Sequence, residues 1–264
     1  MKPRDLSFPE DARRVYNSLV HGLEYDAAFA ILADRVARLP IDSLPKNTLA
    51  VRFAPFAAEN VVHKEFAGFC ARLATISMVA RFDRSNHALL LQRRFLEALA
   101  ASGRPRMPGP ELLMIMRAVR KEIRHNSPVK VVRELLVRKP SPELLSRATW
   151  LSDIYRVRNC LAHREGIVQM EDTEEADSLH VRWLGMKAKI EGTELTAVPY
   201  TVEKAANLEV RIEESERTWK IGDPIHLTAA DSQDIAVNLA LLESRILAEF
   251  ETEMNEFLKN ARNT

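Results

Sequence analysis

The stretch KPSPELLSRATWLSDIYRVRNCLAHREG, residues 139–166, predicts the most clearly delimited helix of the chain. Ser141 is a favourable N-cap, Pro142 suits the first helical position, and Gly166 suits the end of a helix. Four apolar residues recur at helical spacing and share one face: Trp150, Ile154, Val157 and Leu161. We therefore expect this face to pack into the core.

Helical patterns continue on both sides of this stretch. Apolar spacing predicts helices over 9–39, 57–82, 85–103 and from about 110 to 138, with a break at HNSP, and again over 228–261. Ser85 is the expected cap of the third of these helices, and Thr228 or Asp231 of the last. The last helix carries an apolar stripe: Ile235, Leu239, Leu242, Ile246 and Phe250.

A different pattern separates the last two helices. Polar and apolar residues alternate in four segments rich in Val, Ile, Thr and aromatic residues: 178–192, 194–202, 207–214 and 216–228. Trp183 and Trp219 fall in this region and are expected to pack in its core. We therefore expect a mainly α protein with an antiparallel helical bundle over 1–170. A small antiparallel β-sheet over 178–228 precedes a C-terminal helix, 229–264, that packs back on the bundle.

The composition is typical of a soluble globular protein, with 46% hydrophobic and 28% charged residues among 264. No apolar run reaches the roughly 18 residues that a membrane span needs, and the polar N-terminus lacks the apolar segment of a signal peptide. The two cysteines, Cys70 and Cys160, provide neither a disulfide framework nor metal-ligand spacing. We expect a cytoplasmic protein with reduced thiols, no cofactor, no metal site and no membrane association.

Charge is unevenly distributed along the chain. Residues 1–166 hold 28 Lys and Arg against 17 Asp and Glu, a net charge of +11, and the remainder holds 10 against 20, a net charge of −10. A basic half beside an acidic half is consistent with a surface that faces nucleic acid. It is equally consistent with two halves that dock on each other.

An arginine–asparagine–histidine group lies near the end of the 139–166 helix. At 100° per residue, Arg156, Asn159 and His163 share one face, and Arg158 lies on its flank. A histidine can accept the proton of a ribose 2′-OH, and an arginine can stabilise charge on the phosphorus. The other interpretation is an ordinary polar group near a helix C-terminus, where the helix dipole favours histidine.

The segment RNCLAH, residues 158–163, resembles the R-x4-6-H signature of the HEPN superfamily, in which a polar residue often follows the arginine. RNCLAHREGIV also resembles the corresponding segment of uncharacterised bacterial HEPN-like proteins. The likeness covers about residues 151–168 and implies an antiparallel helical bundle. It further implies a metal-independent endoribonuclease, of the kind found in toxin, phage-defence or RNA-processing roles, with Arg158, Asn159 and His163 as catalytic residues. Other HEPN-like proteins use the fold for RNA binding or protein assembly.

A basic stripe is predicted on the helix that begins near residue 110. Arg117, Arg120, Lys121 and Arg124 follow at spacings that place them on one face. This stripe is either a track for an RNA backbone or a solvated helix face. Arg156 and Arg164, on either side of the RNCLAH segment, are further predicted RNA contacts.

The expected partners follow from the resemblance. RNA is the candidate substrate, and HEPN-like proteins commonly form homodimers that bring two motifs into one cleft. An antitoxin or another partner protein is a further possibility, and a non-catalytic binding or assembly module is the main alternative to an enzyme.

Overall fold

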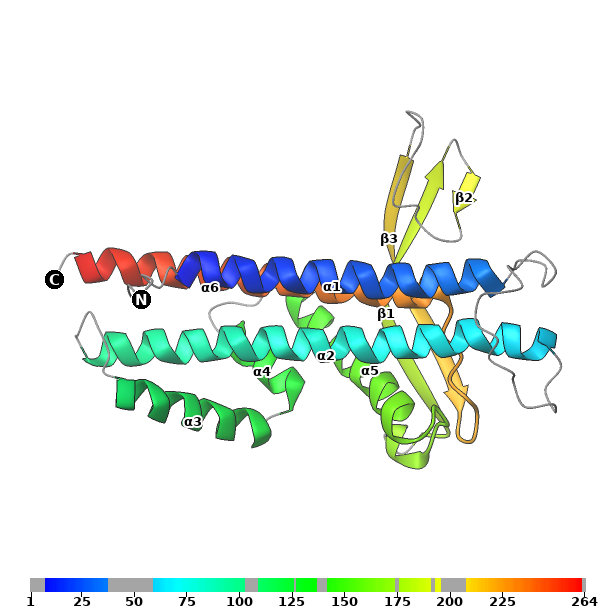
Figure 1. The fold of residues 1–264 in the computed structure, drawn as a ribbon, viewed down its shortest axis with the longest axis horizontal. Coiled ribbons are helices and arrows are strands. Elements are labelled where there is room, and N and C mark those ends of the chain that lie inside the picture. Colours follow the sequence, from blue (N-terminus) through cyan, green and yellow to red (C-terminus); the bar gives the residue numbers. More distant parts are fainter. Residues whose placement is uncertain are drawn as a thin grey trace, which may run out of the picture. The chain divides into compact units, whose positions relative to one another are not determined.

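The computed structural model describes residues 8–37, 59–102, 109–125, 127–136, 142–173, 176–190, 193–195 and 208–262 (Figure 1). The elements follow in the order α1 (Phe8–Ala37), α2 (Glu59–Ser102), α3 (Gly109–His125), α4 (Pro128–Leu135), α5 (Pro142–His163), η2 (Met170–Asp172), β1 (Ser178–Ile190), β2 (Thr193–Leu195), β3 (Leu208–Lys220) and α6 (Ala229–Arg262). The protein is thus mainly helical, with a small antiparallel sheet before the C-terminal helix, as predicted.

The chain forms two compact units, each assembled from segments that are distant in sequence. Unit 1 comprises residues 1–22, 80–152 and 239–264, and unit 2 comprises residues 23–79 and 153–238. The RNCLAH segment belongs to unit 2, whereas α3 and α4 belong to unit 1. Among the helices of the described ranges, none is long and apolar enough to cross a membrane.

Helix α2 is continuous over 44 residues, so the prediction of two helices divided at Ser85 was wrong. Ser85 is buried, and its hydroxyl donates a hydrogen bond to Glu243 on α6. The Asn86 side-chain amide donates to the carbonyl oxygen of Phe82, one turn earlier, at 2.9 Å. Both side chains therefore use bonds that are compatible with a helix interior, although their residue types favour caps.

The predicted break at HNSP is confirmed by the start of α4. Ser127 is its N-cap, and the Ser127 hydroxyl accepts a hydrogen bond from the backbone N–H of Lys130 at 3.3 Å. Pro128 occupies the first helical position, where its missing N–H costs nothing. The predicted extension of this helix to Arg138 lies outside the described residues, since the description ends at Leu136.

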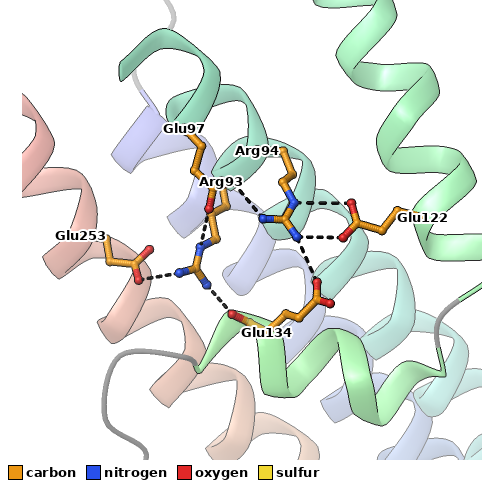
Figure 2. Close-up of polar contacts among 6 residues, drawn as sticks. All are labelled: Arg93, Arg94, Glu97, Glu122, Glu134 and Glu253. Atoms are coloured by element: carbon orange, nitrogen blue, oxygen red, sulfur yellow. Dashed lines mark hydrogen bonds and ion pairs between the residues drawn. The ribbon is translucent and has the colours of Figure 1, made fainter. Parts of the chain in front are cut away.

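Two adjacent arginines on α2 connect four helices of unit 1 (Figure 2). Arg94 bonds Glu122 of α3 at 2.7 Å and Glu134 of α4 at 3.2 Å. Arg93 bonds Glu253 of α6 at 3.0 Å, and it also donates to the backbone carbonyl of Glu134. The hydrogen bond from Arg94 lowers the pKa of Glu122. The network pairs the charges of both arginines with carboxylates at the places where these helices pack against each other.

The sheet of unit 2 has the strand order β2-β1-β3, with β1 antiparallel to both neighbours. β1 and β3 pair along their full length, from Ser178 opposite Lys220 to Ile190 opposite Leu208. The separate strands predicted over 207–214 and 216–228 are therefore wrong, because one strand runs from 208 to 220. Of the segment predicted over 194–202, only residues 194 and 195 are described. Trp183 and Trp219 are buried as predicted.

Side chains of α5 and α6 bond the edge of β1 that faces away from β3. Asp153 accepts from the backbone N–H of Arg182 at 2.9 Å, and Asp234 accepts from that of Met186 at 2.8 Å. Asn238 bonds both the N–H and the carbonyl oxygen of Leu184. Alternate backbone groups are thus satisfied by side chains, which closes an edge that would otherwise remain unpaired.

A reciprocal cap begins α6. The Thr228 hydroxyl accepts from the backbone N–H of Asp231 at 3.1 Å, and the Asp231 carboxylate accepts from the backbone N–H of Thr228 at 2.9 Å. Thr228 is therefore the cap, and Asp231 completes the capping box. The predicted apolar stripe of α6 is buried throughout: Ile235, Leu239, Leu242, Ile246 and Phe250.

Candidate functional site

Helix α5 places the RNCLAH segment at its C-terminal end. Ile154, Val157 and Leu161 are buried, as predicted, whereas Trp150 is only half-buried. The predicted cap, Ser141, lies outside the described residues. These apolar residues face the protein interior, so the polar residues of the last two turns of α5 lie on the opposite face of the helix.

The three residues of the RNCLAH signature lie together on that face. Arg158 Nη1 donates a hydrogen bond to Asn159 Oδ1 at 2.9 Å and lies 3.5 Å from His163 Nε2. A guanidinium only donates, so the second contact is a hydrogen bond when Nε2 carries no proton. Asn159 and His163 are exposed, and Arg158 is half-buried. The group is thus an accessible imidazole beside a positioned guanidinium.

Arg158 differs from the other arginines of this region because it pairs with no carboxylate among the residues that the structure describes. Its Nε is buried and has no hydrogen-bond partner. The neighbouring asparagine therefore orients the guanidinium without neutralising it. A positive charge that is held in place but not compensated suits the binding of an anion.

The two flanking arginines, in contrast, bond groups of the protein itself. Arg156 pairs with Asp153 and donates to the backbone carbonyl of His180 on β1 at 3.2 Å. Arg164 pairs with the buried Asp172 at 2.6 Å, and Asp172 also caps η2. Helical arithmetic placed Arg156 with the signature, but its guanidinium turns to the sheet. These partners give both arginines a structural task, and their contact with RNA stays a prediction.

The helix ends where it was expected to, at two residues with left-handed backbone. Glu165 and Gly166 have φ values of 56° and 79°. Gly166 is buried, and a Cβ added there would lie 3.5 Å from Arg72 Nη1 and 3.4 Å from Leu161 Cδ2. Its role is therefore to end the helix. Arg72 of α2 is a nearby cation that no sequence pattern singled out.

Other reactive groups near the signature are inert in this setting. Cys160 is fully buried, and burial, followed by the charge of Asp172, raises the pKa of its thiol to about 12. The thiol therefore stays protonated and packs in the core, as predicted. Among the described residues, no three His, Cys, Asp or Glu side chains lie close enough to hold a metal ion.

The basic stripe of α3 is exposed in unit 1. Arg117, Arg120 and Lys121 are exposed and pair with no carboxylate within the described ranges. The side chain of Arg124 lies outside the described residues. Val119 is buried on the opposite side of the helix. The stripe is available to solvent or to a polyanion.

The exposed apolar stripes of α1 and α2, together called the apolar surface of unit 2, are a second functional candidate, and sequence analysis missed them. Six large residues of unit 2 are between 43% and 70% exposed: Tyr25, Phe29 and Leu32 on α1, and Phe66, Phe69 and Leu73 on α2. In each helix they follow at intervals of three and four residues, which aligns them in a stripe. Several residues that the same helices bury are small, such as Ala27, Ala30 and Ala71.

Comparisons of this chain with protein-family models, curated proteins and solved structures found no match. The resemblance to the HEPN superfamily therefore rests on the RNCLAH segment and its helical surroundings.

Proposed function

We propose that the protein is an endoribonuclease of the HEPN type, which cleaves RNA without a metal ion. The observation that carries this proposal is the placement of Arg158, Asn159 and His163 on one exposed helix end. There the imidazole lies 3.5 Å from a guanidinium that pairs with no carboxylate among the described residues. The mainly helical fold supports the same proposal in a coarser way.

In this proposal His163 acts as the general base. An unprotonated ring nitrogen takes the proton of a ribose 2′-OH, the 2′-oxygen forms a bond to the adjacent phosphorus, and the bond from phosphorus to the 5′-oxygen breaks. The 5′-oxygen takes a proton from solvent. The products are a 2′,3′-cyclic phosphate and a 5′-hydroxyl.

Arg158 stabilises the additional negative charge on the pentacoordinate phosphorus, because its Nη1 lies 3.5 Å from His163 and so is next to the phosphate that the deprotonated 2′-oxygen attacks. Asn159 positions Arg158, since its Oδ1 accepts from Nη1 at 2.9 Å. Arg72 of α2 lies beside Gly166, after the end of α5, and is a further candidate contact for the RNA backbone.

The test is an incubation of single-stranded and structured RNAs with wild type, His163→Ala and Arg158→Ala in the presence of EDTA. We expect cleavage by wild type and its loss in both variants, by about 10²–10⁴-fold for the general base. His226→Ala is the matched control, because His226 is an exposed histidine of the same unit outside the signature. Cleavage that persists in both signature variants would show that other residues catalyse it.

A second candidate, a non-catalytic assembly module, is favoured by the apolar surface of unit 2. We propose that a second copy of the chain covers it. Each residue leaves roughly 100 Å² uncovered, given the 150–250 Å² that an aromatic side chain buries. Six such residues on each of two copies amount to about 1,200 Å², the lower limit of a stable interface. A homodimer formed here is compatible with either function.

Light scattering after gel filtration tests this assembly. We expect a dimer for wild type and a monomer for the double variant Phe29→Glu, Phe69→Glu. Met114→Glu, which changes an exposed apolar residue on α3, serves as the control and should leave the dimer intact. A monomeric wild type would refute the homodimer. A dimeric protein that cleaves no RNA would favour the assembly module over the enzyme.

A further inference from the structure

Unit 1 has an open pocket of about 480 Å³ that is separate from the RNCLAH segment. Its lining comes from α1 and α2: Arg14, Val15, Ser18 and Leu19, and Arg81, Arg84, Ser85 and Ala88. The volume lies in the range of about 300–1,000 Å³ that is usual for small-molecule sites. None of these eight residues is acidic, and three are arginines.

Each of the three arginines has a partner in the protein and still retains further N–H donors. Asp11 pairs with Arg14 at 3.0 Å. Arg84 Nε donates to a carbonyl oxygen of its own helix, that of Ala80, at 3.3 Å. Arg81 has an interaction elsewhere in the protein, but a guanidinium carries five N–H donors and can serve a ligand at the same time. A phosphomonoester has three terminal oxygens and a charge near −2, so it can accept hydrogen bonds from three guanidinium groups at once.

Gly22 on α1 leaves the space that the Arg81 side chain occupies. A Cβ at residue 22 would lie 2.8 Å from Arg81 Cδ and 3.0 Å from its Nη1. Any larger residue would therefore push the arginine away. The absence of a side chain at residue 22 lets Arg81 lie against α1, beside the other lining residues.

Ser85, which lines the pocket, is held by a buried carboxyl group outside the lining. Ser85 is only 5% exposed, and its hydroxyl donates to Glu243, which is fully buried. Glu243 Oε2 and Asn86 Oδ1 are both buried without a hydrogen-bond partner. Burial raises the pKa of Glu243 to about 7, so below that pH the carboxyl is mostly neutral. In that state it adds no full negative charge behind the arginines.

We propose that this pocket binds a small phosphomonoester of the size of a mononucleotide or a sugar phosphate. Arg14, Arg81 and Arg84 contact the phosphate group. The rest of the ligand lies against the apolar part of the wall, formed by Val15, Leu19 and Ala88. This site is additional to the proposed ribonuclease function and does not depend on it.

Calorimetric titration of the full chain with 5′-AMP, ribose 5-phosphate and adenosine tests the proposal. We expect binding of one or both phosphate esters and much weaker binding of adenosine. The ester that binds more tightly identifies which kind of ligand the wall accepts. Arg84→Gln should weaken phosphate-ester binding about tenfold or more, as expected for the loss of a charge-assisted hydrogen bond.

Two further variants complete the test. Gly22→Ala retains every arginine but displaces Arg81, and it should also weaken binding. Arg35→Gln changes an exposed arginine on α1 that does not line the pocket, and it should have no effect. Failure of both esters to bind, binding of adenosine with equal affinity, or affinities unchanged in Arg84→Gln and Gly22→Ala would overturn the site. Arg158→Ala should bind the esters with the same affinity as wild type. The result of this binding test is therefore independent of whether the protein cleaves RNA.

Discussion

Arg94 in unit 1 and Arg158 in unit 2 carry the same charge in opposite settings. Arg94 contacts three carboxylates, those of Glu97, Glu122 and Glu134. Arg158 contacts an amide oxygen and an imidazole, and it pairs with no carboxylate in the described part of the chain. The contacts of Arg94 connect helices, because Glu122 lies on α3 and Glu134 lies on α4. The contacts of Arg158 hold its positive charge in place, and a bound anion can neutralise it.

The same contrast holds among the arginines at the C-terminal end of α5 and directly after it. Arg156 and Arg164, on either side of Arg158, pair with Asp153 and Asp172. Of these three arginines, only that of the signature pairs with no acidic residue in the ranges that the structure describes. The difference teaches that counting basic residues along a helix does not identify a binding site, because the partner of each residue decides its role.

The largest expected effect concerns cleavage. Arg158→Ala should reduce the rate of RNA cleavage by about 10²–10³-fold, as expected for the loss of a donor that stabilises charge in the transition state. The free energy of unfolding should change by less than about 0.5 kcal/mol, because the side chain ends at the surface. Rates and denaturant unfolding of the same preparation measure both. A large loss of stability would make Arg158 structural and remove the contrast with Arg94.

Arg94→Ala should have the opposite outcome. It leaves Glu122 and Glu134 without their shared cation, and hydrogen bonds to charged groups are worth about 1.5–3 kcal/mol. We therefore expect a loss of stability of about 2–3 kcal/mol with little change in cleavage per folded molecule. Arg245→Ala, on an exposed position of α6, is the control and should lie within about 0.5 kcal/mol of wild type. Equal stability of both variants would show that the network does not hold unit 1.

Glu243 gives the stability of unit 1 a pH dependence. Burial raises its pKa from 4.5 to about 7, so the folded state retains a proton that the unfolded state releases. This carboxyl therefore costs no stability below pH 4.5, and its cost grows as the pH rises to 7. The total is on the order of 3 kcal/mol. Glu243→Gln should reduce the dependence of the free energy of unfolding on pH between 4.5 and 7, and it should stabilise the protein at pH 8. An unchanged pH profile would contradict the assignment.

The smallest expected effect concerns the basic stripe of α3. If Arg117, Arg120 and Lys121 contact an RNA backbone, changing all three to Glu should weaken binding. The slope of log affinity against log salt should then fall by about 2, since each single-strand phosphate contact contributes roughly 0.7. Filter binding at several salt concentrations measures it. An unchanged slope would leave the stripe as a solvated face.

Sequence patterns predicted much of the fold because local signals dominated it. The start of α4 at Ser127, the cap at Thr228 and the buried stripe of α6 follow from residue type and spacing alone. Continuity of α2 through Ser85 could not be predicted in this way, because its cap-forming side chain bonds Glu243, 158 residues away. Alternation alone did not show that β3 is one strand, since its pairing with β1 is a tertiary property.

The candidate site was predictable only in part. Spacing placed Asn159 and His163 together, but it assigned Arg156 to their group and left Arg158 on the flank. In the structure, Arg158 contacts Asn159 and His163, whereas Arg156 bonds Asp153 and a backbone carbonyl of β1. The apolar surface of α1 and α2 escaped notice because helical spacing shows which residues share a face, and not whether another element covers it.

The most direct measurement of the central claim uses an RNA with a single 2′-deoxy nucleotide at the cleaved position. In EDTA, wild type should cleave the all-ribose RNA to a 2′,3′-cyclic phosphate and a 5′-hydroxyl, as resolved by mass spectrometry. It should leave the substituted RNA intact at that position. Cleavage of the 2′-deoxy substrate, or products with 5′-phosphate ends, would contradict attack by a ribose hydroxyl that His163 deprotonates.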